Sequence, residues 1–277
     1  MIIDSRMRPL YGSFAAQFAP EACEPFFKKL GMEMPPSVKQ GSEALMLQEM
    51  DEAGIDIGIA PSRFIGNKEL EAMVAHYQGR FIGLASIDGD NTIRENLEIV
   101  ERHVVNGRLK GVHFEPGHSL KVPRKADDPV FYPIYEYCQE KSIVVAVMLG
   151  GNNGPNLVEH TNPAIITRLA RDFPDVRWFV CHGGWPWVTE ILGVCFWYEN
   201  IWIESDLYLY GAPGWREYVD AANGFLQDRF MFSSGYPLLP LKETVDGAKA
   251  LFKEEVLDKI MFKNAAELFG IDLEGGK

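Results

Sequence analysis

Residues 176–187 read Val-Arg-Trp-Phe-Val-Cys-His-Gly-Gly-Trp-Pro-Trp, and this stretch decides the fold prediction. Apart from Arg177, the residues before the histidine are aromatic, β-branched or otherwise apolar, which is typical of a buried strand. His182 ends the run, and the two glycines after it permit a tight turn or a close approach of the backbone. Pro186 stands where the first turn of a helix tolerates a missing N–H group. The pattern predicts a strand, a histidine at its carboxyl end, a tight turn and a helix.

A histidine at the carboxyl end of a buried strand stands where parallel α/β folds place their chemistry. We therefore treat His182 as a candidate catalytic residue, since the glycines beside it also leave space for a ligand. The alternative is a histidine whose ring is satisfied by the backbone of the turn.

Outward from this stretch, strand-like and helical patterns alternate along the chain. Strands are expected at about 2–4, 57–60, 81–86, 109–114, 143–148, 176–181, 201–204 and 229–232. Eight such strands with helices between them predict an α/β fold, a (β/α)₈ TIM barrel, in a single domain spanning residues 1–277. A doubly wound sheet is the alternative, but no G-x-G-x-x-G motif follows an early strand.

Two segments, one near each end of the chain, lie outside the regular alternation of strands and helices. The stretch from about 7 to 41 contains several prolines and is expected to be an irregular insertion. Its phenylalanines make it too apolar for a disordered loop, so it either covers the mouth of the barrel as a lid or docks on a second subunit. A helix at about 255–270 is expected to close the chain.

The charge balance limits the partners of the protein. The net charge of −12 argues against nucleic acid or an anionic membrane surface as a partner. A small anionic substrate remains possible, because it responds to the local charge of a site. No apolar run is long enough to span a membrane.

Cysteine and tryptophan usage adds two expectations. The four cysteines never form C-x-x-C, and the amino terminus lacks a signal peptide, so they are expected to be reduced, buried thiols in a cytoplasmic protein. Tryptophans concentrate late in the chain, which is compatible with a self-association surface and a homo-oligomer, although core packing is the commoner role. These tryptophans are Trp185, Trp187, Trp197, Trp202 and Trp215.

In a TIM barrel the active site lies at the carboxyl ends of the strands. The residues predicted there are Arg6 and Arg8 after the first strand, Glu115 after the fourth, Asn152 after the fifth, His182 after the sixth, Asp206 after the seventh and Tyr236 after the eighth. Two arginines, two carboxylates and a histidine at one mouth predict an anion-binding site with acid–base capacity.

Each of these residues also has a structural alternative. The arginines can pair with Glu115 and Asp206 in an ion network. Asp206 can instead cap the turn before Pro213. For Tyr236, packing is preferred over catalysis.

Four segments together resemble the amidohydrolase-related family, the decarboxylase and hydrolase branch of the amidohydrolase superfamily of TIM barrels. They are Ile3-Asp4-Ser5, the Cys181–Trp187 segment, Ser233-Ser234-Gly235-Tyr236-Pro237, and the closing segment from Lys259 to Gly270. The resemblance covers nearly the whole chain, and it implies the same barrel fold with its active site at the strand ends.

The usual metal site of that family is altered in this chain. The resemblance places the two histidines of its H-x-H motif on Arg6 and Arg8, the strand-five histidine on Met148 and the strand-eight aspartate on Gly235. Of the usual ligands only His182 is present. A guanidinium has no lone pair to offer and glycine has no side chain, so the resemblance implies a subset in which R-x-R replaces H-x-H and the usual zinc site is lost.

The resemblance and the strand-end residues predict a metal-independent enzyme, a hydrolase or lyase without a cofactor. Its substrate would be a small carboxylate-bearing molecule such as a lactone, which it would hydrolyse, isomerise or decarboxylate, since some relatives are thought to work without a metal. Two arginines can supply the positive charge that a metal otherwise provides.

The predicted roles divide the site residues into two sets. The catalytic set is His182 and Asp206, which share the acid–base work, and Glu115, which orients an arginine or acts as a second base. The binding set is Arg6, Arg8, Asn152, Trp185 and Tyr236. Two alternatives stay open: a barrel without catalysis that binds an anionic metabolite, and a metal-dependent hydrolase with a rearranged zinc site at His182.

Overall fold

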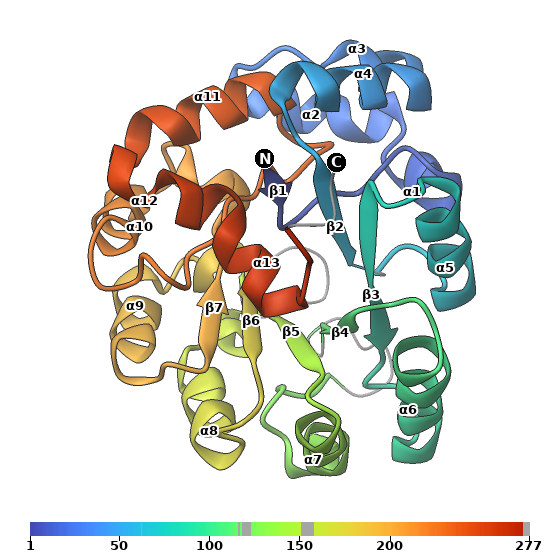
Figure 1. Cartoon of the computed structure of the whole chain (residues 1–277), viewed down its shortest axis with the longest axis vertical. Helices are drawn as coiled ribbons and strands as arrows, with labels where there is room; N and C mark the ends of the chain where they lie inside the picture. Colours follow the sequence, from blue (N-terminus) through green and yellow to red (C-terminus); the bar gives the residue numbers. More distant parts are fainter. Residues whose placement is uncertain (62, 116, 118–122, 151–157, 274–277) are drawn as a thin grey trace.

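The computed structural model describes residues 1–61, 63–115, 117, 123–150 and 158–273. Within these residues, seven strands form one parallel sheet in the order of the chain. They are β1 (Ile3–Asp4), β2 (Ile57–Pro61), β3 (Phe81–Ile87), β4 (Gly111–Phe114), β5 (Val144–Met148), β6 (Trp178–Cys181) and β7 (Ile201–Ile203). Figure 1 shows the strands curled round a common axis with helices outside them. The predicted α/β barrel class and single domain are confirmed.

The predicted eighth strand at 229–232 does not join the sheet as a regular strand. Phe230 makes one isolated parallel bridge to β7. On the other side, the Ser5 N–H donates to the Phe232 carbonyl (2.9 Å). The pairing is interrupted at Gly235, whose φ of +71° lies outside the strand region, and it resumes at an isolated parallel bridge between Met7 and Tyr236. This segment therefore links β7 to β1 through single pairs rather than through a continuous ladder.

Helices occupy the outer layer and connect the strands. Their bounds are α1 (Gly12–Gln17), α2 (Pro20–Leu30), α3 (Pro36–Gln40), α4 (Glu43–Ala53), α5 (Asn67–His76), α6 (Ile93–Val100), α7 (Tyr132–Glu140), α8 (Ala164–Asp172), α9 (Val188–Trp197), α10 (Trp215–Ala222), α11 (Leu241–Leu251), α12 (Glu254–Asp258) and α13 (Asn264–Phe269). A π-helical turn, η1 (Glu101–Val105), extends α6, and another, η7 (Lys259–Lys263), joins α12 to α13. The predicted closing helix at 255–270 corresponds to α12, η7 and α13.

The stretch from 7 to 41 is largely helical, and the prediction of an irregular insertion is wrong. It forms α1, α2 and α3. Pro20 and Pro36 each occupy the first turn of their helix, where a missing N–H leaves no intrahelical bond unmade. Two of the prolines that suggested irregular structure therefore start helices, whereas Pro25 lies inside α2. Phe14 and Phe27 are buried and attach this segment to the barrel.

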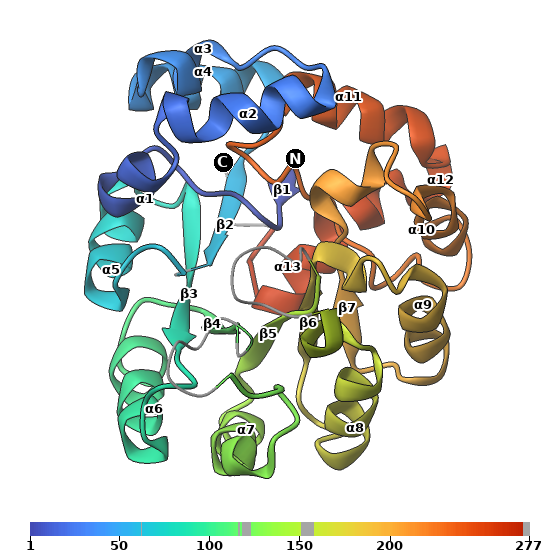
Figure 2. The same ribbon diagram turned by 180° about the vertical axis from the view of Figure 1, so that it is seen from behind.

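The core has two parts. One lies between the sheet and the outer helices, and the other fills the inside of the barrel. The inner part contains inward side chains from six strands and residues from α13, among them Ile3, Ile59, Leu84, Val144, Phe179, Trp202, Ala265, Leu268 and Phe269. In Figure 1, α13 lies across one end of the barrel, and Figure 2 shows the opposite end, which α13 does not cover.

We expect Asn264 to be a strong anchor of α13. Its side-chain nitrogen donates to the carbonyls of Gln227 (2.8 Å) and Phe230 (2.7 Å), and the residue is buried. Asn264→Ala leaves both carbonyls without this donor and should lower the free energy of unfolding by about 2–3 kcal/mol, as measured by urea denaturation. The exposed Asn106→Ala is the control, with an expected change within about 0.5 kcal/mol. Equal effects of the two variants would contradict this role.

The surface features relevant to partners are few. Trp197 is 78% exposed and packs edge-on against Phe196, which in turn contacts Phe225. Self-association through tryptophan remains a prediction. The four cysteines are buried and unpaired. Across the described ranges, the helices are either too short or too polar to cross a lipid bilayer.

Candidate active site

The turn after β6 places His182 at the end of the barrel that α13 leaves open. His182, Gly183 and Gly184 all have positive φ, at 63°, 62° and 69°. Glycine adopts this conformation freely, whereas a histidine is strained in it. The end of β5 lies close by, because a Cβ added to Gly150 would stand 2.6 Å from the His182 Cβ. The glycines of the deciding stretch therefore form a tight turn that presents the imidazole.

His182 contacts Asp206, the residue predicted at the end of β7. The His182 Nδ1 lies 2.7 Å from the Asp206 Oδ2, a close contact that is not aligned as a hydrogen bond. Both residues are buried, and Asp206 also has a positive φ of 30°. The backbone N–H groups of Leu207 and Tyr208 lower the pKa of its carboxyl, which fits the alternative that Asp206 also caps its own turn. The structure therefore places this carboxylate against the imidazole, and Nε2 is the ring nitrogen left for another partner.

Arg6 lies between two carboxylates without binding either tightly. Its Nε is 3.6 Å from the Asp206 Oδ2, and its Nη2 is 4.0 Å from the Glu115 Oε1. The side chain is 1% exposed, and in the described chain neither nitrogen has a hydrogen-bond partner. The ion network therefore balances the charge of Arg6 but leaves two of its nitrogens without a hydrogen-bond acceptor in the described chain.

Arg8 differs from Arg6 because no acidic side chain of the described ranges pairs with it. It is buried, its Nε lacks a hydrogen-bond partner, and its guanidinium stands over the Phe18 ring at 5.5 Å. Burial, helped by the charge of Arg6, lowers the pKa of Arg8 to about 9. The charges of Glu115 and Asp206 raise the pKa of Arg8 without pairing with it directly, so this guanidinium can accept an anion from the cavity.

Glu115 connects the arginines to two residues that the sequence analysis missed. Its Oε2 is 2.9 Å from the Arg63 Nε, and its Oε1 is 3.4 Å from the His113 Nε2. Both missed residues had a signal. Arg63 comes just after β2, and His113 stands two residues before Glu115, so that the two share one face of the strand. Burial raises the pKa of Glu115, and Arg63 and Arg6 oppose this shift.

The electrostatics favour a neutral imidazole at His182. Burial lowers the pKa of His182 well below its usual value of 6.5, and the charge of Arg6 lowers it further. Burial raises the pKa of Asp206 to about 6, against the opposing effect of Arg6. At neutral pH the ring therefore has a free lone pair, which a general base needs.

This pKa shift can be tested by NMR. In a titration from pH 8 to pH 4, the ring signals of His182, assigned by their absence in His182→Asn, should stay in the neutral form well below pH 6.5. In Arg6→Gln the midpoint should move to higher pH, because a cation that disfavours the imidazolium is gone. A midpoint at or above 6.5 in the native protein, or a downward shift in Arg6→Gln, would contradict this account.

A cavity of about 630 Å³ opens beside these residues. Arg8, Arg63, His182 and Asp206 line its polar side. The rest of the wall is largely apolar and comes from α1 and α2, the loop after β2, and the residues that follow β6 and β7, with Gln17, Phe18, Ala22, Phe26, Lys29, Leu30, Phe64, Trp185, Tyr208 and Tyr210 among its members. The helical segment predicted as a lid therefore forms the outer wall of this cavity.

The remaining predicted pocket residues have different positions. Trp185 lines the cavity and stacks on Tyr208, with the ring centroids 4.6 Å apart. Tyr236 is fully buried, and its hydroxyl is 2.8 Å from the Ser37 Oγ, so its position matches the packing alternative. Asn152 lies outside the described residues.

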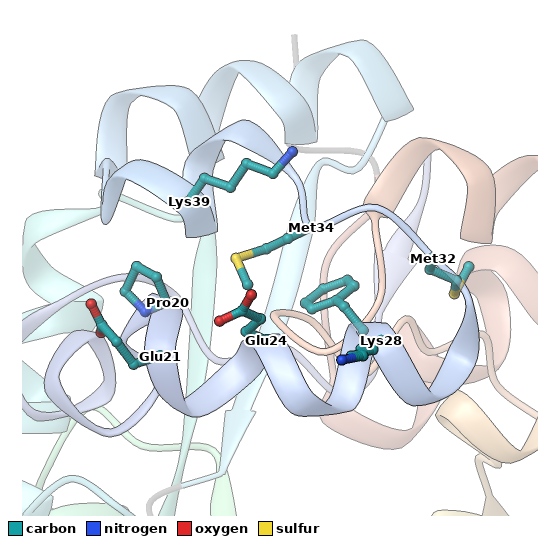
Figure 3. Close-up of a pocket in the computed structure, with 8 residues that line it drawn as sticks. Pro20, Glu21, Glu24, Lys28, Met32, Met34 and Lys39 are labelled. Atoms are coloured by element: carbon teal, nitrogen blue, oxygen red, sulfur yellow. The ribbon is translucent and has the colours of Figure 1, made fainter.

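Another cavity, of about 610 Å³, lies beside α2 and away from this group (Figure 3). The side chains that line it include Glu21, Glu24, Lys28 and Lys39, with Met32 and Met34. Its charges are mixed, and it contains none of the strand-end residues. The chemistry is therefore assigned to the cavity at His182.

A metal would have to bind at His182, Glu204 and Asp206, whose donor atoms lie within 4.8 Å of one another. This is the candidate group found among the described residues. Both Glu204 oxygens already accept hydrogen bonds, one from the backbone N–H of His182 and one from the Ser233 hydroxyl. Arg6 is 3.6 Å from the Asp206 oxygen, where its charge repels a cation. The hydrogen bonds at Glu204 and the charge of Arg6 therefore both oppose a cation at this group.

The position that the resemblance gives to the strand-eight aspartate is Gly235. A Cβ there would lie 3.4 Å from the Asp206 Cβ and 3.6 Å from its Oδ2. The carboxylate of Asp206, which follows β7, therefore stands beside the place where that aspartate would start. Because Gly235 has no side chain, the carboxylate of Asp206 can occupy the space beside it.

Comparison with known proteins gives consistent results. A family model described as amidohydrolase matches residues 45–271. An uncharacterised TIM-barrel protein from Bordetella bronchiseptica is 35% identical, with a TM-score of 0.91 over 97% of this chain and 98% of that one. No curated protein matches the chain.

Two further structures share the fold at low identity. A probable 2-pyrone-4,6-dicarboxylic acid hydrolase from Acinetobacter baumannii, with citric acid bound, is 16% identical with a TM-score of 0.60, covering 82% of this chain and 88% of that one. A 2,6-dihydroxybenzoate decarboxylase from Rhizobium is 17% identical with a TM-score of 0.68, covering 98% and 99%. At such identities the likeness concerns the fold alone.

Proposed function

This chain belongs to the amidohydrolase family, and from that premise we propose that it is a metal-independent enzyme of an R-x-R subset that hydrolyses a small carboxylate-bearing substrate such as a lactone. The observation that carries the proposal is Arg8, a buried guanidinium that lines the cavity and has no acidic partner in the described chain. A carboxylate of the substrate would supply the missing counterion.

Arginine can take over the electrostatic duty of a metal in this cavity. A metal would stabilise the negative charge that develops on a carbonyl oxygen. Arg8 faces the cavity beside His182, and the buried Arg6 adds its positive charge from behind the cavity wall. Positive charges that are fixed in place stabilise such a charge strongly, because they need no reorganisation during the reaction.

In the proposed hydrolysis, His182 and Asp206 move one proton. The His182 Nε2 takes a proton from water while the water oxygen bonds to the carbonyl carbon. The carbonyl electrons move to the oxygen, where an arginine stabilises them, and Asp206 stabilises the imidazolium. When the ring C–O bond breaks, the proton passes from Nε2 to the leaving oxygen, and a hydroxy acid forms.

Glu115 fits the role of an orienting residue in this scheme. It is 2.9 Å from Arg63 and 4.0 Å from Arg6, so it holds guanidinium groups at the polar side of the cavity. Carboxylate-bearing molecules also appear in the names of two fold relatives, the dicarboxylic acid hydrolase and the dihydroxybenzoate decarboxylase. At their low identity these relatives share only the fold, so the substrate class proposed here depends on Arg8 and is left to experiment.

A two-step screen tests the proposal. Purified protein is first assayed by thermal shift against lactones with and without a carboxylate, and the stabilising compounds are then incubated with the protein and analysed by NMR. We expect carboxylated lactones to raise Tm and to yield hydroxy acids at a rate unaffected by EDTA. Stabilisation without any product would favour the alternative of an inactive barrel that binds an anionic metabolite.

The cluster of His182, Glu204 and Asp206 keeps one competing function open to test, a hydrolase with a rearranged zinc site. Elemental analysis of protein purified without added metal distinguishes the two. About one zinc per chain, together with activity that chelation removes and zinc restores, would support the competitor. We expect substoichiometric metal, because Arg6 occupies the same corner.

A further inference from the structure

Two strained residues meet at the center of this site. His182 and Asp206 both have positive φ, at 63° and 30°, although neither is glycine. Such conformations cost on the order of 1–3 kcal/mol each and persist only where the surroundings hold them. Their side chains are in contact at 2.7 Å, so a small backbone shift at either residue would separate them. The structure must therefore contain groups that hold both backbones.

The His182 backbone is held by a side chain in place of a backbone group. Between β6 and β7, the Glu204 N–H donates to the Val180 carbonyl (3.2 Å), as in a regular parallel ladder. The next rung would join the His182 N–H to the Glu204 carbonyl. Instead, the backbone N–H of His182 donates to the side-chain Oε1 of Glu204 (2.9 Å). The side chain thus completes the ladder where His182 leaves the strand conformation.

Ser233 extends this arrangement to Asp206. Its hydroxyl donates to the Glu204 Oε2 (2.6 Å) and accepts the Asp206 backbone N–H (2.9 Å). One continuous chain of hydrogen bonds therefore runs from the His182 backbone, through Glu204 and Ser233, to the Asp206 backbone. Glu204 and Ser233 are both buried, and every bond in the chain is shielded from water.

Neither of these two residues reaches the cavity. His182 and Asp206 line it, whereas Glu204 and Ser233 are not among its lining residues. A residue that cannot touch the substrate can act only through those that do. Both oxygens of the Glu204 carboxylate accept a hydrogen bond in this chain of hydrogen bonds. The Ser233 hydroxyl donates one hydrogen bond and accepts another in it.

We propose that Glu204 and Ser233 are positioning residues that hold the backbones of His182 and Asp206 so that the imidazole and the carboxylate stay paired. The catalytic consequence rests on the proposed function, but the positional effect does not depend on any activity. A misplacement of about 1 Å at a reacting group can lower a rate about 100-fold, so the loss of this support should be visible in kcat.

The matched pair Ser233→Ala and Ser233→Thr tests the proposal. Ser233→Ala removes the link between Glu204 and Asp206, and we expect kcat to fall by about 10- to 100-fold. KM should change by less than about threefold, since Arg8 binds the carboxylate independently. Ser233→Thr keeps a hydroxyl and should restore most of kcat. Thr167→Val, which removes a hydroxyl hydrogen bond in α8, is the control for a purely structural loss.

The ¹⁵N chemical shift of the His182 Nδ1 gives a readout without activity. It should change in Ser233→Ala and remain native-like in Ser233→Thr and Thr167→Val. A folded Ser233→Ala protein with a native Nδ1 shift and a native kcat would overturn the proposal. If the native protein turns over none of the lactones, the proposed function fails, while the Nδ1 shift still decides whether Ser233 positions His182.

A second pair covers the case in which Ser233→Ala does not fold. Glu204→Gln keeps a carbonyl oxygen that can accept the His182 N–H, whereas Glu204→Ala keeps none. We expect a native-like Nδ1 shift in Glu204→Gln and a changed shift in Glu204→Ala. A native shift in both would overturn the proposal, as would a changed shift in both with equal loss of kcat.

Discussion

His182→Asn is expected to lower kcat by about three orders of magnitude while leaving carboxylate binding nearly unchanged. The amide of Asn fills part of the same space but cannot take a proton from water near neutral pH. Binding should persist, because it depends on Arg8, which is a separate group on the cavity wall. The measurement is kcat on a carboxylated lactone, combined with calorimetric titration of a non-hydrolysable carboxylate.

The control for this variant is His103→Asn. His103 lies in η1 on the outer layer, where its Nδ1 is 3.0 Å from Glu71. It is not among the residues that line the cavity. Its replacement should change kcat by less than about twofold. If His182→Asn retained more than a tenth of the native kcat, the imidazole would not be the general base.

Arg8→Met should weaken carboxylate binding by about 10- to 150-fold, which corresponds to about 1.5–3 kcal/mol for hydrogen bonds to a charged group. The same variant should make the free protein more stable. Arg8 is buried without an acidic partner in the described chain, and a methionine of similar length removes that cost. We expect the free energy of unfolding of the unliganded protein to rise by about 1–2 kcal/mol.

These opposite signs make the test specific. Arg94→Met, at a side chain that is 89% exposed and pairs with Glu98, should leave both binding and stability within about 0.5 kcal/mol of the native values. Weaker binding together with lower stability in Arg8→Met would indicate a structural arginine. Unchanged binding would remove the main support for a carboxylate substrate.

The fold could be predicted because alternation of strand and helix patterns depends on local sequence. Two details depended on longer-range geometry. The segment after α10 bridges β7 and β1 only through single pairs, since the positive φ of Gly235 interrupts the strand conformation. The prolines at 20 and 36 start helices, a role that their number alone did not distinguish from a loop.

The site could be predicted only in part, because strand ends indicate which residues share a mouth but not how they pair. The contact of His182 with Asp206 and the missing partner of Arg8 required coordinates. Glu204 was missed because it looks like the last residue of a strand. Its proposed positioning role depends on its side chain accepting the backbone N–H of His182 in place of a backbone carbonyl. No sequence pattern indicates such a replacement.

The position of α13 has a consequence for the traffic of small molecules. Ala265 and Leu268 of α13 pack inside the barrel among the strand side chains, so in the described structure that end is sealed. Reactant and product therefore both use the cavity at His182, on the other side. A product that keeps its carboxylate must depart before the next reactant enters, and its accumulation should slow the enzyme by competitive inhibition.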